Sequence, residues 1–215
     1  MRKIVKTIGC AMTIAIAAAA VAACGNGKAS EQNPAASAED AVYENIMTRT
    51  SIRAFDGKTV EPEKVDKMLR AGMAAPSAVN RQPWHFVVVD DHGVMQNIGA
   101  GSFNARIYET ATLTIVVCGD MSKIPADQIN ETWVMDASAA TENILLEAHA
   151  LGLGAVWTAV YPYKDRMDAA VSALGLPENI VPMSSIIMGY PAENPAPKDK
   201  WKPENVSYNK FGGKK

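Results

Sequence analysis

Four short apolar runs constrain the fold of this chain more than any other feature: HFVVVD (85–90), TLTIVVCGD (112–120), AVWTAVY (155–161) and PMSSIIMGYP (182–191). They are rich in β-branched residues and carry charge only at their ends, which is typical of strands buried on both faces. We therefore expect each run to form a strand inside a core.

Helical patterns separate these runs. The expected helices are residues 38–47, EPEKVDKMLRAGMAA (61–75), a helix over 93–109 broken by Gly99 and Gly101, DASAATENILLEAHAL (136–151) and DRMDAAVSALG (165–175). Intermixed helices and strands in one domain of this size predict a sheet sandwiched by helices.

The second and fourth helical patterns show most clearly which side is buried. The helix over 61–75 starts with Pro62 in its first turn and has an apolar stripe of Val65, Met68, Leu69 and Met73. The pattern over 136–151 places small or apolar residues at helical spacing, which permits another helix to approach closely. These are Ala137, Ala140, Ile144, Ala148 and Leu151. We expect this to be the central helix.

The last segment, residues 192–211, is proline-rich and basic in its middle. Proline is disfavoured in central strands, so we expect this tail to run extended along a surface, its own or a partner's.

The N-terminus has the pattern of a bacterial lipoprotein. MRKIVK is basic, residues 7–23 are apolar and alanine-rich, and Val21-Ala22-Ala23-Cys24 resembles a lipobox. We expect residues 1–23 to be a lipoprotein signal peptide, 24–37 a flexible tether with lipidated Cys24, and 38–215 the folded domain. A plain secretory signal and a retained anchor helix are the alternatives. The expected location is the bacterial cell envelope, with lipid anchoring in the outer membrane favoured, if there are two membranes, because Gly25 is not Asp.

Charge and cysteine content exclude other classes. Removal of residues 1–23 takes away three basic residues and no acid, so the net charge of −2 becomes −5, and nucleic-acid binding is not expected. Cys118 is then left without an internal partner, so the domain must be held by its core rather than by disulfides.

Common catalytic motifs are missing. No serine lies in G-x-S-x-G, and the three histidines share no metal-ligand spacing, so no metal is expected. Gly99-Ala-Gly101 begins like a dinucleotide loop but lacks its third glycine and a preceding strand. A paired-carboxylate hydrolase stays open, although no acidic pair stands out.

Basic residues give a more specific indication. In an extended segment, Arg49, Ser51 and Arg53 lie on one face, where two guanidinium groups and a hydroxyl suit a phosphate. Lys200 and Lys202 repeat this spacing in the tail. Either pair by itself is equally typical of a solvated surface.

The stretch APSAVNRQPW (75–84) is unusually polar for a helix–strand junction. Pro76 and Pro83 stiffen its backbone, and Ser77, Asn80 and Gln82 offer hydroxyl and amide groups to the edge of a polar heterocycle.

Together these motifs resemble the nitroreductase family of flavin enzymes. The family pattern is R-x-S-x-R/K, then P-S-x-x-N-x-Q-P-W, then GLG-x-x-W after a central helix, then a basic tail, and all four occur here in order over residues 40–211. The resemblance implies an α+β fold, an α/β/α sandwich with a mainly antiparallel central sheet flanked by helices and a domain-exchanged C-terminal tail.

The resemblance also implies a function. Family members bind FMN at a homodimer interface and transfer hydride by a ping-pong route from NADH or NADPH to the flavin and then to a nitroaromatic, quinone or similar planar acceptor. The flavin carries the chemistry, so no catalytic side chain is required. The implied FMN-binding residues are Arg49, Thr50, Ser51, Arg53, Pro76, Ser77, Ala78, Asn80, Gln82, Trp157, Thr158, Ala159, Lys200 and Lys202.

Individual roles follow from the same resemblance. Arg49, Ser51 and the two tail lysines would hold the phosphate, and Arg53 would offset negative charge on the reduced ring. Pro76, Ser77 and Asn80 would contact the isoalloxazine, with Pro76 and Ser77 supplied by the other subunit. A backbone N–H of residues 157–159 would approach flavin N5.

Two alternatives share this resemblance: a non-catalytic flavin-binding electron relay, and a reductive dehalogenase or flavin-degrading enzyme with a lid formed by residues 100–111 and 121–134. An exported protein meets little NAD(P)H, so a quinone or membrane redox partner is a further possible donor.

Overall fold

The computed structural model describes residues 37–100, 102–125 and 131–215. The predicted signal peptide and Cys24 lie outside the described residues, as does part of the possible lid over 121–134. None of the helices within those ranges has the length and apolar character needed to cross a membrane.

Every expected helix and strand is present in the described residues. The helices are α1 (Ala38–Thr48), α2 (Pro62–Met73), α3 (His92–Gly99), α4 (Thr132–Ala150) and α5 (Lys164–Leu174), and the strands are β1 (Trp84–Val89), β2 (Leu113–Asp120), β3 (Gly154–Ala159) and β4 (Ile180–Gly189). The predicted break after Gly99 is confirmed, because α3 ends there and a short 3-10 segment, η2 (Ala105–Glu109), follows.

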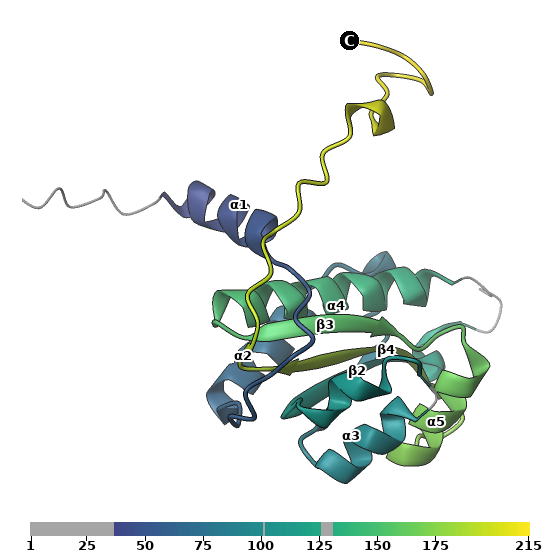
Figure 1. Cartoon of the computed structure of the whole chain (residues 1–215). Coiled ribbons are helices and arrows are strands. Elements are labelled where there is room, and N and C mark those ends of the chain that lie inside the picture. The colour runs from purple at the N-terminus through teal and green to yellow at the C-terminus, as the bar shows by residue number, and fades with distance from the viewer. Residues whose placement is uncertain (1–36, 101, 126–130) are drawn as a thin grey trace, which may run out of the picture. The chain divides into compact units, whose positions relative to one another are not determined.

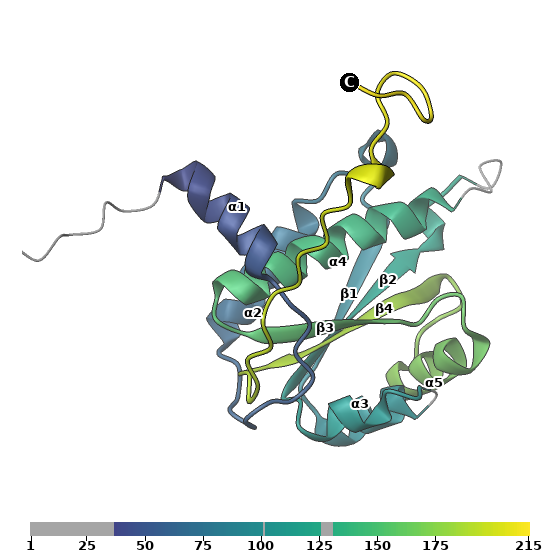
Figure 2. The same ribbon diagram turned by 45° about the horizontal axis from the view of Figure 1, so that its top comes forward.

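The four strands form one antiparallel sheet in the order β1-β2-β4-β3, so β1 and β3 are its edges. Helices α2 and α4 pack on one face and α3 and α5 on the other (Figures 1 and 2). The predicted α+β sandwich is therefore confirmed.

Side-chain alternation along β2 builds two core layers. Ile115 and Val117 face the layer formed with α2 and α4, whereas Val116 and Cys118 face α3 and α5, and all four are fully buried. Both faces of the strand are apolar, as its unbroken hydrophobic sequence predicted.

The central helix α4 is buried as predicted. Its small residues Ala137, Ala140 and Ala148, with Ile144, have no exposed surface. In α2, Met68 is also fully buried, but the prediction that Met73 is buried was wrong, because 53% of it is exposed. Met73 is the last residue of α2 and lines a hollow beside edge strand β1, where no described element covers it.

Gly152 and Gly154, where the chain passes from α4 into β3, lie next to the RTSIR segment, residues 49–53. Gly152 has a φ of +75°, and Gly154 lies so close to Ile52 that a Cβ there would be 2.6 Å from the Ile52 Cγ2. The N–H of Ile52 donates to the Ala155 carbonyl at 3.1 Å, and Ser51 pairs with Ala155 as an isolated parallel bridge. Residues 51–52 thus lie along the outer edge of β3.

The tail after β4 is extended and has one 3-10 turn, Pro203–Asn205. Its backbone runs away from the body of the domain (Figures 1 and 2), and two of its aromatic side chains are largely exposed, since Trp201 is 71% and Phe211 fully exposed. Exchange of this tail with a second copy stays a prediction.

Candidate functional site

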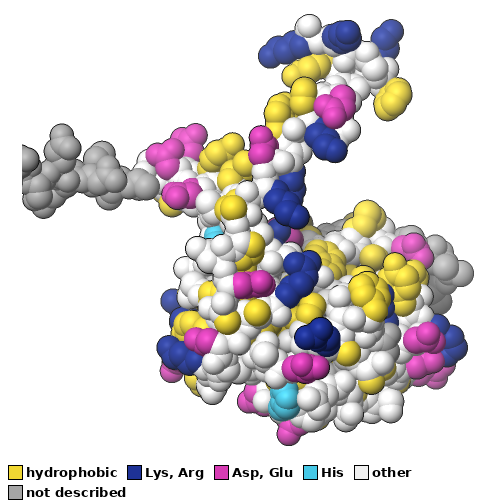
Figure 3. Space-filling view, viewed as in Figure 1, with side chains coloured by type: hydrophobic (Ala, Val, Ile, Leu, Met, Phe, Trp, Pro, Cys, Tyr) yellow, Lys and Arg dark blue, Asp and Glu magenta, His cyan; other side chains and the backbone are white. Residues whose placement is uncertain are grey.

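A cationic pocket lies where the RTSIR segment meets the start of the tail. Its cavity of about 290 Å³ is lined by Arg49, Thr50, Ser51, Arg53, Glu193, Pro195, Ala196, Lys198 and Lys200. Figure 3 shows Lys and Arg side chains following the tail down to the body of the molecule. Four of the predicted FMN-binding residues, Arg49, Thr50, Ser51 and Arg53, are therefore brought together with one of the two predicted tail lysines, Lys200.

Two carboxylates organise this pocket. Glu193 accepts hydrogen bonds from the backbone N–H groups of Arg53 and Ala54, which ties the tail to the RTSIR segment. Glu142 on α4 lies 3.5 Å from the Arg49 guanidinium. Because four basic side chains and one carboxylate line the pocket, the net charge of its lining is positive and suits an anion with more than one charge.

The tail lysines differ from the prediction in one respect. Lys198 lines the pocket beside Lys200, whereas Lys202 does not line it. The tail carries a basic residue at every second position from Lys198 to Lys202, so the periodicity could have included Lys198. The role of Lys202 stays a prediction.

The outer edge of β3 continues from this pocket. The Ala155 carbonyl points away from β4 towards Ile52, so by strand alternation the N–H groups of Trp157 and Ala159 point the same way. No residue that the structure describes accepts from either of them. The hydroxyl of Thr158 is committed elsewhere, since it donates to the Ser185 carbonyl at 3.0 Å. The segment therefore offers backbone donors, at Trp157 and Ala159, rather than its threonine side chain.

The polar loop at residues 76–82 is strained. Val79, Asn80 and Gln82 have φ angles of 45°, 56° and 52°, in the left-handed region that residues other than glycine rarely adopt. Each such residue costs about 1–3 kcal/mol, and strain of this kind persists only where the surroundings enforce it.

Four hydrogen bonds enforce the loop conformation. Buried Asp136 of α4 accepts from the Ala78 N–H at 2.9 Å, and the Ser77 Oγ accepts from the Gln82 N–H at 2.9 Å. The Gln82 amide donates to the Asn80 Oδ1 at 3.1 Å, and Lys123 Nζ donates to the Gln82 carbonyl at 3.1 Å. Ser77, Asn80 and Gln82 thus use some of their hydrogen-bonding groups to hold the loop itself. The sequence did not indicate that Asp136 also holds the loop.

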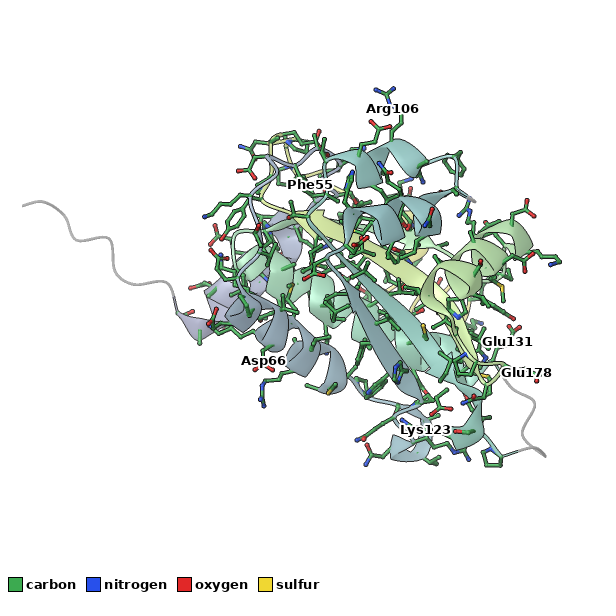
Figure 4. The ribbon with its side chains drawn as sticks, turned by 90° about the horizontal axis from the view of Figure 1, so that it is seen from below. Phe55, Asp66, Arg106, Lys123, Glu131 and Glu178 are labelled. Atoms are coloured by element: carbon green, nitrogen blue, oxygen red, sulfur yellow. The ribbon has the colours of Figure 1, made fainter. Side chains whose placement is uncertain are left out.

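One chain does not bring this loop to the cationic pocket. The loop precedes edge strand β1, while the pocket adjoins the start of β3, the opposite edge of a four-stranded sheet about 14 Å across. The strands β1 and β3 also begin at opposite ends of the sheet. Figure 4 shows the two ends of the sheet: Lys123 lies at the end with the polar loop, and Phe55, close to the start of β3, lies at the other end.

Comparison with known proteins identifies the family. The model of the nitroreductase family matches residues 46–101 and 94–190. The chain belongs to the nitroreductase family.

This nitroreductase-family chain covers most of the length of its relatives. A Methanothermobacter thermautotrophicus protein, provisionally named NADH dehydrogenase/NAD(P)H nitroreductase, is 42% identical over 79% of this chain and 87% of its own. A Bacteroides thetaiotaomicron structure with the same provisional name is 45% identical, with a TM-score of 0.74 over 79% of this chain and 97% of its own. A Desulfovibrio desulfuricans structure, provisionally named a nitroreductase and solved in complex with FMN, is 30% identical, with a TM-score of 0.68 over 79% and 97%.

Asp136 gives a first testable prediction for this nitroreductase-family loop. Replacing Asp136 with Leu leaves the Ala78 N–H without its acceptor, and we expect the free energy of unfolding to fall by about 1–3 kcal/mol. Asp136→Asn keeps an acceptor oxygen and should cost clearly less. Urea unfolding of both variants measures the difference, and equal losses would show that the hydrogen bond does not hold the loop.

His149 gives a second prediction. Its Nε2 lies 2.9 Å from the Thr48 Oγ1, and burial, with the nearby Arg49 charge, lowers its pKa below the usual histidine value. The folded state therefore favours neutral His149, so this contribution to stability is complete above the ordinary pKa of histidine. It is lost as the pH falls from there through the lowered pKa of the folded state. We expect urea unfolding at pH 7.5 and 5.5 to show a smaller pH dependence for His149→Gln than for the wild type. His92→Gln, at the exposed first residue of α3, is the control and should leave the wild-type pH dependence in place.

The single described cysteine is not a candidate nucleophile. Cys118 is fully buried in β2, and burial raises its pKa to about 12. A thiol in this state stays protonated at neutral pH, so chemistry at the site does not draw on it.

Proposed function

We propose that this protein is an FMN-dependent NAD(P)H oxidoreductase of the nitroreductase type that reduces a nitroaromatic, quinone or similar planar acceptor. One observation carries the proposal: the cationic pocket and the donor-bearing outer edge of β3 adjoin through the Ser51–Ala155 bridge. A phosphorylated planar ring system presents both an anion and a polar edge. The relative solved with FMN supports this choice.

The residues present fit FMN. Ser51 lies beside Ala155, and Ala159 is four residues further, ~13 Å along the strand, so phosphate and ring would occupy successive parts of one site. Arg49, Lys198 and Lys200 would hold the phosphate, and the N–H groups of Trp157 and Ala159 would meet the ring edge. Arg53 would offset negative charge on the reduced ring. When bound, the flavin supplies the hydride chemistry.

The proposed site needs a second copy of the chain. The strained loop lies at the far edge of its own sheet, so its contact with the ring would come from a partner subunit. Exposed apolar residues support this assembly: Tyr43, Ile46 and Met47 of α1 line a hollow of about 480 Å³ together with Trp201. Sedimentation velocity of the purified protein tests it, and a monomer at micromolar concentration would contradict it.

Spectroscopy and rapid kinetics test the function. The purified protein should show a flavin spectrum, release FMN on denaturation, and be reduced by NADH or NADPH in stopped flow. Steady-state turnover with a nitroaromatic acceptor should follow. A protein that stays colourless after reconstitution with FMN would contradict the proposal. A yellow protein reduced by neither nucleotide would instead favour an electron relay fed by a quinone or a membrane partner.

The envelope location is part of this proposal and rests on the N-terminal sequence alone. Processing before Cys24 would yield an N-terminal peptide with acyl chains, which mass spectrometry of membrane-extracted protein detects. Cys24→Ser should release the protein from the membrane fraction. Wild-type protein found only in the soluble fraction, with its N-terminus intact, would contradict lipid anchoring.

A further inference from the structure

Arg166 of α5 lies at the end of the outer edge of β3. Its Nη1 donates to the Ala159 carbonyl at 2.7 Å, and Ala159 is also the residue whose N–H points outward from the sheet. The guanidinium carbon lies 4.2 Å from the centre of the Tyr163 ring and 5.1 Å from that of Phe103. The two rings and the carbonyl fix the plane and direction of the guanidinium group.

Within the part of the chain that the structure describes, this guanidinium group is a half-buried cation without a carboxylate partner. Among the residues that the structure describes, no Asp or Glu oxygen lies within 4.0 Å of it, although its neighbour Lys164 pairs with Asp168 on the same helix. A guanidinium has five N–H donors, and the Ala159 carbonyl takes one. Partial burial without a counter-ion carries a desolvation cost that an incoming anion would offset.

The position of Arg166 excludes the flavin phosphate as that anion. Ala159 lies ~13 Å along β3 from Ala155, where the cationic pocket begins, so Arg166 is at the opposite end of the proposed ring site. The exposed Phe103 ring and the Tyr163 ring beside the guanidinium group offer apolar surface next to the charge. A planar aromatic molecule with an acidic substituent would use both features.

We infer that Arg166 is a specificity residue that binds the carboxylate of an aromatic acceptor. The inference rests on the proposed function, because it places that acceptor beside the ring held at Trp157 and Ala159. Aromatic carboxylates are then preferred to neutral aromatics of the same shape.

A matched pair of acceptors tests this preference. With the FMN-loaded full-length protein, 4-nitrobenzoate and 4-nitrobenzamide differ in charge but share the ring and nitro group. We expect the ratio of their kcat/KM values to favour the benzoate, and Arg166→Gln to lower that ratio about 10-fold or more. Arg166→Lys should keep part of it. Lys164→Gln removes a cation from the same helix and should leave the ratio unchanged.

A binding measurement gives a readout independent of turnover. Benzoate and benzamide are titrated into the oxidised flavoprotein, and the change in flavin absorbance reports both dissociation constants. Arg166→Gln should weaken the binding of benzoate about 10-fold or more and that of benzamide little. Added salt should weaken benzoate binding in the wild type only. FMN content per chain is measured in the same samples.

The outcomes separate the two proposals. If Arg166→Gln binds FMN and weakens both ligands equally, Arg166 only supports the Ala159 carbonyl and the inference fails. If Arg166→Gln changes only the kinetics with NADPH and leaves the kcat/KM ratio of the two acceptors intact, the inference also fails. A wild-type protein that binds no FMN overturns the proposed function first, before any Arg166 variant is compared, and the inference falls with it.

Discussion

Replacing both Arg49 and Lys200 with Gln is expected to weaken FMN binding by about 1,000-fold. Both side chains line the cationic pocket, and each hydrogen bond to a charged group contributes about 1.5–3 kcal/mol. Riboflavin has the same ring without the phosphate, so its affinity should change little. Fluorescence titration with FMN and riboflavin measures both constants, and the diagnostic quantity is the ratio between them.

Two controls separate the phosphate contact from general effects of charge. Arg70→Gln with Lys164→Gln removes two cations from exposed positions, where they pair with Asp66 and Asp168, and should leave the FMN to riboflavin ratio unchanged. Glu142→Gln removes the carboxylate beside Arg49 and should not weaken FMN. Equal loss of FMN and riboflavin in the Arg49 and Lys200 variant would place the phosphate elsewhere.

Gly154→Ala is expected to lower the free energy of unfolding by about 3 kcal/mol and to weaken FMN binding as well. A Cβ at Gly154 would lie 2.6 Å from the Cγ2 and 2.8 Å from the Cβ of Ile52, which is β-branched and buried and has little room to move. Overpacking of this kind typically costs about 1–3 kcal/mol. Displacement of Ile52 carries Ser51 with it, away from its bridge to Ala155.

Gly152→Ala is the matched control because it adds the same methyl group two residues away. Gly152 has a φ of +75°, but no neighbouring atom lies within 4 Å of the place that an alanine Cβ would take, so only its backbone conformation opposes alanine. We expect a cost of about 1 kcal/mol and unchanged FMN binding. Urea unfolding and FMN titration of both variants test this, and equal costs would show that the contact with Ile52 is not the constraint.

The positions of the loop and the pocket explain why the proposed site would need a dimer. Strain at Val79, Asn80 and Gln82 is held by bonds from α4 and Lys123, so the loop is preformed in one chain. It nevertheless lies across the sheet from the pocket to which it is expected to contribute. Assembly of two copies would bring an already ordered loop to each ring. The loop would not have to become ordered on binding, which avoids an entropic cost.

The family motifs located most of the candidate site, but not its geometry. R-x-S-x-R put Arg49, Ser51 and Arg53 in the pocket, since extended backbone places alternate residues on one face. Lys198 was missed, because which tail lysines line the pocket depends on where Glu193 ties the tail down. Asp136 and Arg166 were missed because their partners, Ala78 and Ala159, are 58 and 7 residues away and meet them only through packing.

The sequence by itself determined the elements: four strands from unbroken β-branched runs, helices from 3.6-residue periodicity, and a helix break at Gly99. These are local properties, fixed by backbone conformation and side-chain spacing. Only the tertiary structure decided the order β1-β2-β4-β3, which strands form the two edges, and the placement of Arg166 beside Ala159. Strand order and such contacts depend on how segments far apart in the chain share one core, and no local pattern encodes that arrangement.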